Sequence, residues 1–105
     1  MTPYMALALA ITAEVIATSA LKATESFTRP WPSVLVVVAY AVAFYFLSVA
    51  VKVIPVGVAY GIWSGLGIVL VSVIAFLLHK QSLSLYQIMG LMLIVLGVAL
   101  VNFKS

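Results

Sequence analysis

Residues 56–78 read VGVAYGIWSGLGIVLVSVIAFLL. This stretch contains no Asp, Glu, Lys or Arg, and it exceeds the roughly 20 apolar residues that a helix needs to cross a bilayer. Three further stretches, 4–21, 32–51 and 85–103, meet the same criterion and are joined by short connectors. The sequence therefore predicts an all-α membrane protein with four transmembrane helices per chain, folded as a single domain over residues 1–105.

The composition excludes a water-soluble globule. Of the 105 residues, 67% are hydrophobic and 7% are charged, against roughly 25% charged residues in soluble domains. One histidine, two acids and no cysteine provide neither a catalytic triad nor a metal cluster. We therefore expect no enzyme, no metal and no cofactor, and no binding of nucleic acid.

The cations in the loops are nearly balanced between the two sides of the membrane. Four spans place both termini on one side, which carries Lys52 and Lys104, while Lys22, Arg29 and Lys80 lie on the other. An excess of Lys and Arg orients membrane proteins with short loops. A count of two against three therefore predicts insertion in both orientations, with opposite copies paired as an antiparallel homodimer. A single fixed orientation is the alternative.

Glu14 is the one acid inside a predicted span, and it is the strongest functional signal in the chain. A charged side chain at this depth costs about 3 kcal/mol or more, so such residues are rare and usually functional. No Lys or Arg inside a span neutralises it. A proton and an organic cation would compete for its single charge, which is the minimal mechanism of exchange. Two copies facing each other in a dimer would titrate as a coupled pair.

Small side chains leave space beside this carboxylate on its own helix. Leu7, Ala10, Ala17 and Thr18 share the face of Glu14 at helical spacing. These four residues, together with Ser64 of the third span, are therefore predicted to line a pocket.

Aromatic side chains on two other spans are candidates for binding a cation. Tyr40 and Phe44 are i,i+4 neighbours in the second span, and Tyr60 and Trp63 are i,i+3 neighbours in the third, followed by Ser64. Aromatic faces attract cations by about 2 kcal/mol when both are desolvated. Ordinary packing or lipid contact is the alternative for each ring. Trp63 is the strongest candidate, because an indole N–H in mid-span needs a partner.

The six glycines all lie in the last two spans. Gly65 and Gly67 in the third predict either a hinge or close helix packing, and the two can coexist. Gly90 and Gly97 in the fourth lie two turns apart on one face, beside an apolar groove. This groove favours docking between chains, with packing inside one bundle as the alternative.

Taken together, these motifs resemble the small multidrug resistance family over nearly the full length. The matching stretches are Ala13-Glu14-Val15-Ile16, Glu25-Ser26-Phe27-Thr28-Arg29, Ile54-Pro55, Ala59-Tyr60, Ile62-Trp63-Ser64-Gly65 and Gly90 with Gly97. Tyr40 and the Trp63-Ser64-Gly65 triplet favour its quaternary-ammonium branch. The guanidinium exporters of the same family typically carry Trp-Thr-Gly and lack that tyrosine.

The resemblance implies a proton-coupled antiporter in the bacterial inner membrane, assembled as an antiparallel homodimer with dual topology. Its substrates would be hydrophobic, quaternary ammonium and polyaromatic cations, exchanged for protons as the coupling ion. Glu14 would be the shared site for proton and substrate. The resemblance also implies that Tyr60 and Trp63, with Tyr40 and Phe44 beside them, bind the substrate, that Gly65 and Gly67 form a kink, and that Gly90 and Gly97 form the dimer contact.

Some positions depart from the common family pattern and bear on the range of substrates. They are Ala8, Leu9, Ala43, Tyr45 and Ser84. Two other functions remain as alternatives: a guanidinium exporter of the same architecture, and a pore-forming or accessory membrane subunit.

Overall fold

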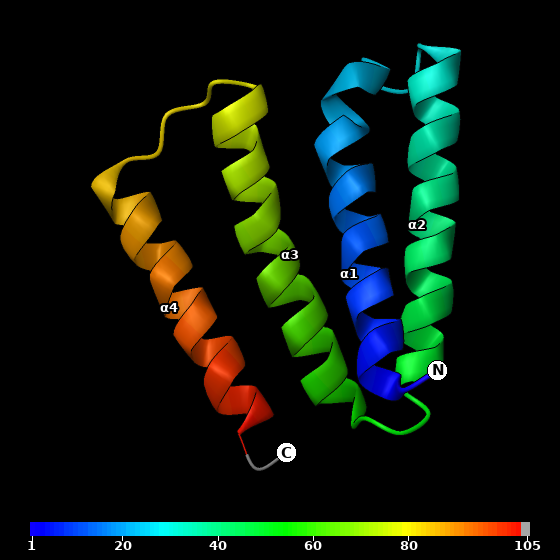
Figure 1. Ribbon diagram of the computed structural model, residues 1–105. Coiled ribbons are helices and arrows are strands. Elements are labelled where there is room, and N and C mark those ends of the chain that lie inside the picture. Colours follow the sequence, from blue (N-terminus) through cyan, green and yellow to red (C-terminus); the bar gives the residue numbers. More distant parts are fainter. Residues whose placement is uncertain (104–105) are drawn as a thin grey trace.

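The computed structural model describes residues 1–103 and contains the four long helices that the sequence predicts (Figure 1). They are α1 (Pro3–Ala20), α2 (Pro30–Ala50), α3 (Val56–Leu78) and α4 (Leu85–Asn102), and a short 3-10 helix, η1 (Leu21–Thr24), extends α1. All four are long and apolar enough to cross a membrane, so the four-span architecture is confirmed. Lys104, one of the cations in the charge count, lies outside the described residues.

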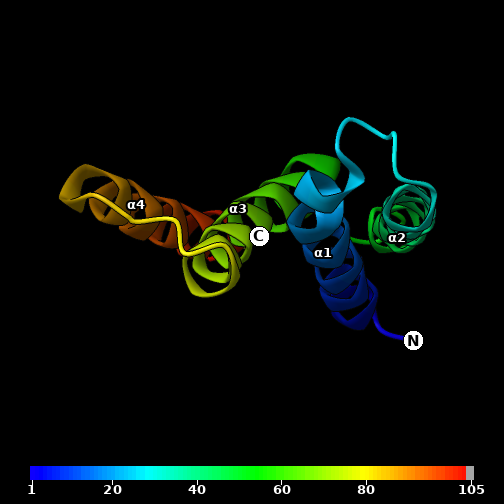
Figure 2. The same ribbon diagram turned by 90° about the horizontal axis from the view of Figure 1, so that it is seen from above.

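The helices form a thin layer rather than a compact bundle. In Figures 1 and 2 they follow one another in the order α4, α3, α1 and α2, and the principal extents are 42 × 34 × 17 Å. α1 packs along both α2 and α3, whereas α4 packs along α3. A hydrogen bond from Tyr4 Oη to Asn102 Oδ1 (3.2 Å) joins the start of α1 to the end of α4. These two ends therefore lie on the same side, as four spans require.

Prolines mark where the helices begin. Pro3 and Pro30 occupy the first turns of α1 and α2, and Pro55 immediately precedes α3. The missing proline N–H has no partner in a first turn anyway, so these positions tolerate it. The first connector is shorter than the sequence predicted. The 3-10 helix η1 extends helical structure to Thr24, and α2 begins at Pro30 rather than at residue 32.

The connector between α1 and α2 is held by one buried threonine. Glu25, Ser26 and Phe27 have left-handed backbone angles (φ of 47°, 61° and 66°), which are unfavourable for residues other than glycine. Thr24 is 1% exposed; its hydroxyl donates to the Leu21 carbonyl (2.7 Å) and accepts from the Phe27 N–H (3.2 Å). The side chain of Thr24 thus stabilises a turn that contains no glycine.

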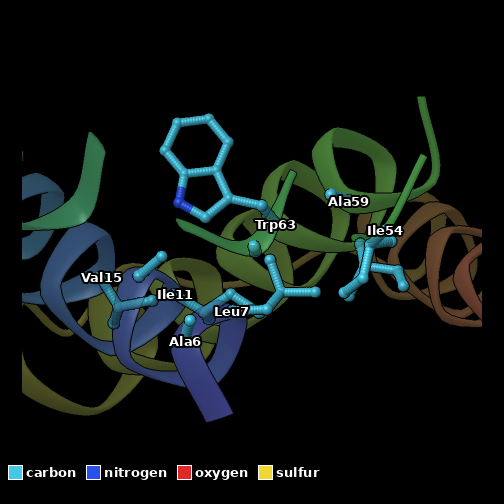
Figure 3. Close-up of a cluster of buried hydrophobic side chains, with 10 residues drawn as sticks. Ala6, Leu7, Ile11, Val15, Ile54, Ala59 and Trp63 are labelled. Carbon is cyan, nitrogen blue, oxygen red and sulfur yellow. The ribbon is translucent and has the colours of Figure 1, made fainter. Parts of the chain in front are cut away.

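The core lies where α1 meets α3, and it is built from small side chains. Ala6 and Ala10 of α1 and Ala59 of α3 have no exposed surface, which lets the two helices approach closely. Figure 3 shows larger side chains from α1, from α3 and from the segment that leads into α3 gathered around these contacts. The labelled residues are Ala6, Leu7, Ile11, Val15, Ile54, Ala59 and Trp63.

α4 differs from the other three helices because none of its residues is buried. Apart from the adjoining residues and the backbone of the same helix, no described atom lies within 4 Å of where a Cβ on Gly90 or Gly97 would be. A capping box starts the helix: Ser84 Oγ accepts from the Gln87 N–H (3.1 Å), and Gln87 Oε1 accepts from the Ser84 N–H (2.8 Å). Ser84, one of the departures from the family pattern, therefore has a structural role as a helix cap.

Candidate functional site

Glu14 lies in the middle of α1, half-buried on the side that faces α3. Its Oε1 accepts a hydrogen bond from the hydroxyl of Thr18, one turn further along the helix (3.4 Å). Its Oε2 is buried and has no hydrogen-bond partner among the described residues. Since buried polar atoms are nearly always paired, this oxygen is the atom best placed to take up a proton or to face a cation.

The unpaired oxygen lies directly against Gly67. A Cβ on residue 67 would overlap the Glu14 carboxylate, whose carbon would be 2.9 Å away. The sequence predicted either a hinge or close helix packing at Gly67. It did not predict this contact, because no spacing rule relates a glycine on one helix to an acid on another. α3 runs as one continuous helix through Gly65 and Gly67, and the hinge itself stays a prediction.

A second hydroxyl extends the site from α1 to α2. Thr18 Oγ1 and Tyr40 Oη are 2.6 Å apart. A threonine hydroxyl has a single proton, so when Thr18 donates to Glu14 the proton in the second bond must come from Tyr40. The chain of donors then runs from Tyr40 through Thr18 to the carboxylate. The structure thus connects Tyr40 to the acid through the hydroxyl of Thr18.

The other two predicted aromatics, Phe44 and Tyr60, lie beside the indole of Trp63. The Trp63 ring centroid is 5.5 Å from that of Phe44 and 5.6 Å from that of Tyr60, both within the usual range for aromatic pairs. Trp63 is 8% exposed, and its Nε1 is buried without a hydrogen-bond partner among the described residues. The outer faces of Phe44 and Tyr60 are open. This arrangement can accept a flat or cationic ligand against aromatic surface.

The predicted pocket-lining residues occupy two kinds of position. Leu7, Ala10 and Ala17 are buried in helix packing, and the hydroxyl of Ser64 donates to the Tyr60 carbonyl of its own helix (2.7 Å). Thr18 alone among these predicted residues makes a polar contact with Glu14. Within one chain, the site is therefore a carboxylate with a chain of hydroxyls on one side and an aromatic cluster on α2 and α3.

Comparison with known proteins identifies the family. The protein-family model described as Small Multidrug Resistance protein matches residues 2–94 of the sequence. The chain belongs to this family. The quaternary ammonium compound-resistance proteins QacF of Klebsiella aerogenes and QacE of Escherichia coli are 56% and 53% identical, each over 97% of this chain and 93% of the relative. The multidrug transporter EmrE of Escherichia coli (strain K12) is 47% identical over 100% of this chain and 96% of its own length.

Membership of the small multidrug resistance family confirms the resemblance found in the sequence and makes the chain a multidrug efflux transporter. With four spanning helices and bacterial relatives, it is a multi-pass protein of the bacterial inner membrane. The matched region contains Glu14, Tyr40 and the aromatic cluster, and it ends within α4 before Gly97.

Proposed function

We propose that this chain is a proton-coupled antiporter that exports hydrophobic quaternary ammonium and polyaromatic cations, with Glu14 as the shared site for proton and substrate. The observation that carries the proposal is the Glu14 carboxylate itself. Within the described part of the chain, Thr18 donates to one of its oxygens, and the other oxygen is buried without a partner. The names of QacE and QacF, which refer to quaternary ammonium compounds, support this substrate class.

Exchange follows from the single charge at this position. When Glu14 is protonated it is neutral and attracts no cation, and when it is ionised it attracts either a proton or an organic cation. The two ligands exclude each other, so binding of one releases the other. Trp63, Tyr60 and Phe44 add aromatic surface, which favours a desolvated cation by about 2 kcal/mol.

The working unit is an antiparallel homodimer, in which a second, inverted copy supplies a second Glu14. Two features support this assembly: the one-chain layer is thin, and no other helix of the described chain fills the space beside Gly90 and Gly97 on α4. The near-balanced loop cations support insertion in both orientations. Because the chain has no cysteine, a single Cys introduced beside Lys52 reports topology directly. Labelling from one face only would contradict dual topology.

Uptake of a tetraphenyl cation into proteoliposomes, driven by a pH gradient, tests the exchange mechanism. Glu14→Gln keeps the size of the side chain and removes its charge, so we expect uptake to fall by about a hundredfold or more, which corresponds to about 2.7 kcal/mol. Glu25→Gln is the matched control, because it neutralises the other acid of the chain, which is exposed in the first connector. Undiminished uptake by Glu14→Gln would overturn the assignment.

The same liposomes separate the alternatives. Guanidinium currents without currents from the tetraphenyl cation would favour a guanidinium exporter. Passive ion conductance without a gradient would favour a pore, and no activity without a second protein would favour an accessory subunit.

A further inference from the structure

The two glycines in the middle of α3 face different neighbours. An α-helix turns about 100° per residue, so residues 65 and 67 point about 200° apart. A Cβ on Gly65 would meet α4, lying 2.5 Å from Val98 Cγ2 and 3.4 Å from Ile94 Cγ2. A Cβ on Gly67 would instead meet the Glu14 carboxylate of α1. Gly65 therefore leaves room for side chains of α4, and Gly67 leaves room for the carboxylate of Glu14.

The room left by Gly67 lies beside the aromatic cluster. Trp63 precedes Gly67 by four residues, so the two share one face of α3, one turn apart. Glu14 Oε2 and Trp63 Nε1 are both buried, and neither has a hydrogen-bond partner within residues 1–103. By lying against the bare backbone at Gly67, the carboxylate is held on the same face of α3 as the indole.

We propose that Gly67 is a positioning residue for Glu14: its missing side chain provides the seat in which the carboxylate lies, whereas Gly65 serves the packing of α3 on α4. This inference rests on the proposed function, in which Glu14 binds proton and cation. A methyl group at 67 displaces the carboxylate from α3 and from the aromatic face, and so changes its affinity for both ligands. A methyl group at 65 displaces Val98 instead.

A hinge makes a different prediction. Gly65→Ala and Gly67→Ala remove the same amount of backbone freedom from the same turn of the same helix. If flexibility were the role of these glycines, the two substitutions would have similar effects on binding. Comparing the two variants therefore distinguishes a flexible hinge at these glycines from a role of Gly67 in positioning the Glu14 carboxylate.

The experiment measures binding of a tetraphenyl cation, and the protons released on binding, from pH 5 to pH 9 for the wild-type chain and both alanine variants. We expect Gly67→Ala to weaken binding by about tenfold or more and to move the pH of half-maximal binding by about one unit. Gly65→Ala should leave that pH unchanged. Similar shifts of the pH of half-maximal binding in both variants, or no shift in Gly67→Ala, would overturn the proposal that Gly67 positions Glu14.

Two rescue variants test the contacts themselves. Glu14→Asp is one methylene shorter, so Gly67→Ala should weaken binding less in the Glu14→Asp background than in the wild type. Val98→Ala should compensate Gly65→Ala and leave the effect of Gly67→Ala unchanged. If Gly67→Ala does not fold, recovery of the fold in the double variant with Asp at 14 supports the seat, and failure of that double variant contradicts it. A wild-type chain that neither binds the cation nor releases protons would overturn the proposed function, a result distinct from any of these.

Discussion

α1 and α4 are equally long and both meet the criteria for a membrane span, yet they are used in opposite ways. α1 lies between two helices and buries Ala6, Ala10 and Ala17 completely, whereas α4 lies at the edge of the layer and buries nothing. In lipid an apolar side chain loses nothing by exposure, so hydropathy does not separate the two helices. The two helices differ instead in the close packing of small residues, which α1 has and α4 lacks.

The difference divides the chain into a part that binds and a part that assembles. The polar and aromatic contacts of the site all lie on α1, α2 and α3. α4 contributes no side chain to them, and the space beside Gly90 and Gly97 on its glycine face is not filled by another helix of the described chain. Substitutions in the first part should change ligand affinity without changing assembly, and substitutions on α4 should do the reverse. The following predictions test this division.

The largest effect is expected from a bulky side chain on the glycine face of α4. Gly97→Leu places a leucine where we expect the second copy to pack, so the dissociation constant of the dimer should rise by about a hundredfold, and transport should be lost with the dimer. Ala99→Leu is the matched control, because residue 99 is exposed and lies on the opposite side of α4. Crosslinking in liposomes measures the dimer. A dimer that tolerates Gly97→Leu as well as Ala99→Leu would remove α4 from the interface.

A smaller effect, on affinity alone, is expected at the indole. Trp63→Leu removes the centre of the aromatic cluster, so binding of a tetraphenyl cation should weaken by about tenfold, as loss of a cation–π contact predicts. Tyr86→Leu on α4 is the control, since that ring is 84% exposed and away from the site. Isothermal titration calorimetry measures the affinity of both variants for the cation. Equal losses of affinity would mean that the binding surface extends over α4, against the division.

Much of this arrangement could be predicted from the sequence, and the missing part has a physical reason. Helix spans follow from hydropathy, and the importance of Glu14 follows from its depth, because both depend on local composition. The contact between Glu14 and Gly67 depends on how α1 and α3 rotate against each other, which no local pattern specifies. The same holds for Tyr40, which the sequence grouped with Phe44 and which the structure joins to Thr18.

A threefold to tenfold effect is expected from the hydroxyl chain. Tyr40→Phe removes the donor to Thr18, and one hydrogen bond contributes about 0.5–1.5 kcal/mol. The affinity for the cation and its dependence on pH should therefore change together, because Thr18 also contacts Glu14. Tyr45→Phe removes the same hydroxyl from an exposed ring on the same helix and serves as the control. If the pH dependence is identical in both variants, the hydroxyls are structural and do not tune the carboxylate.

The smallest effect is expected at the start of α4. Ser84→Ala removes the cap, which costs about 1 kcal/mol of helix stability, so amide exchange in the first turn of α4 should accelerate about fivefold. Ser84→Asp should restore slow exchange, because aspartate caps a helix as well as serine does. Neither change should alter the affinity for the cation at Glu14, since α4 contributes no contact to that site. An altered affinity in Ser84→Ala would show that the first turn of α4 influences the exchange site, through its packing against α3. Binding and assembly would then not be separate functions of the two parts of the chain.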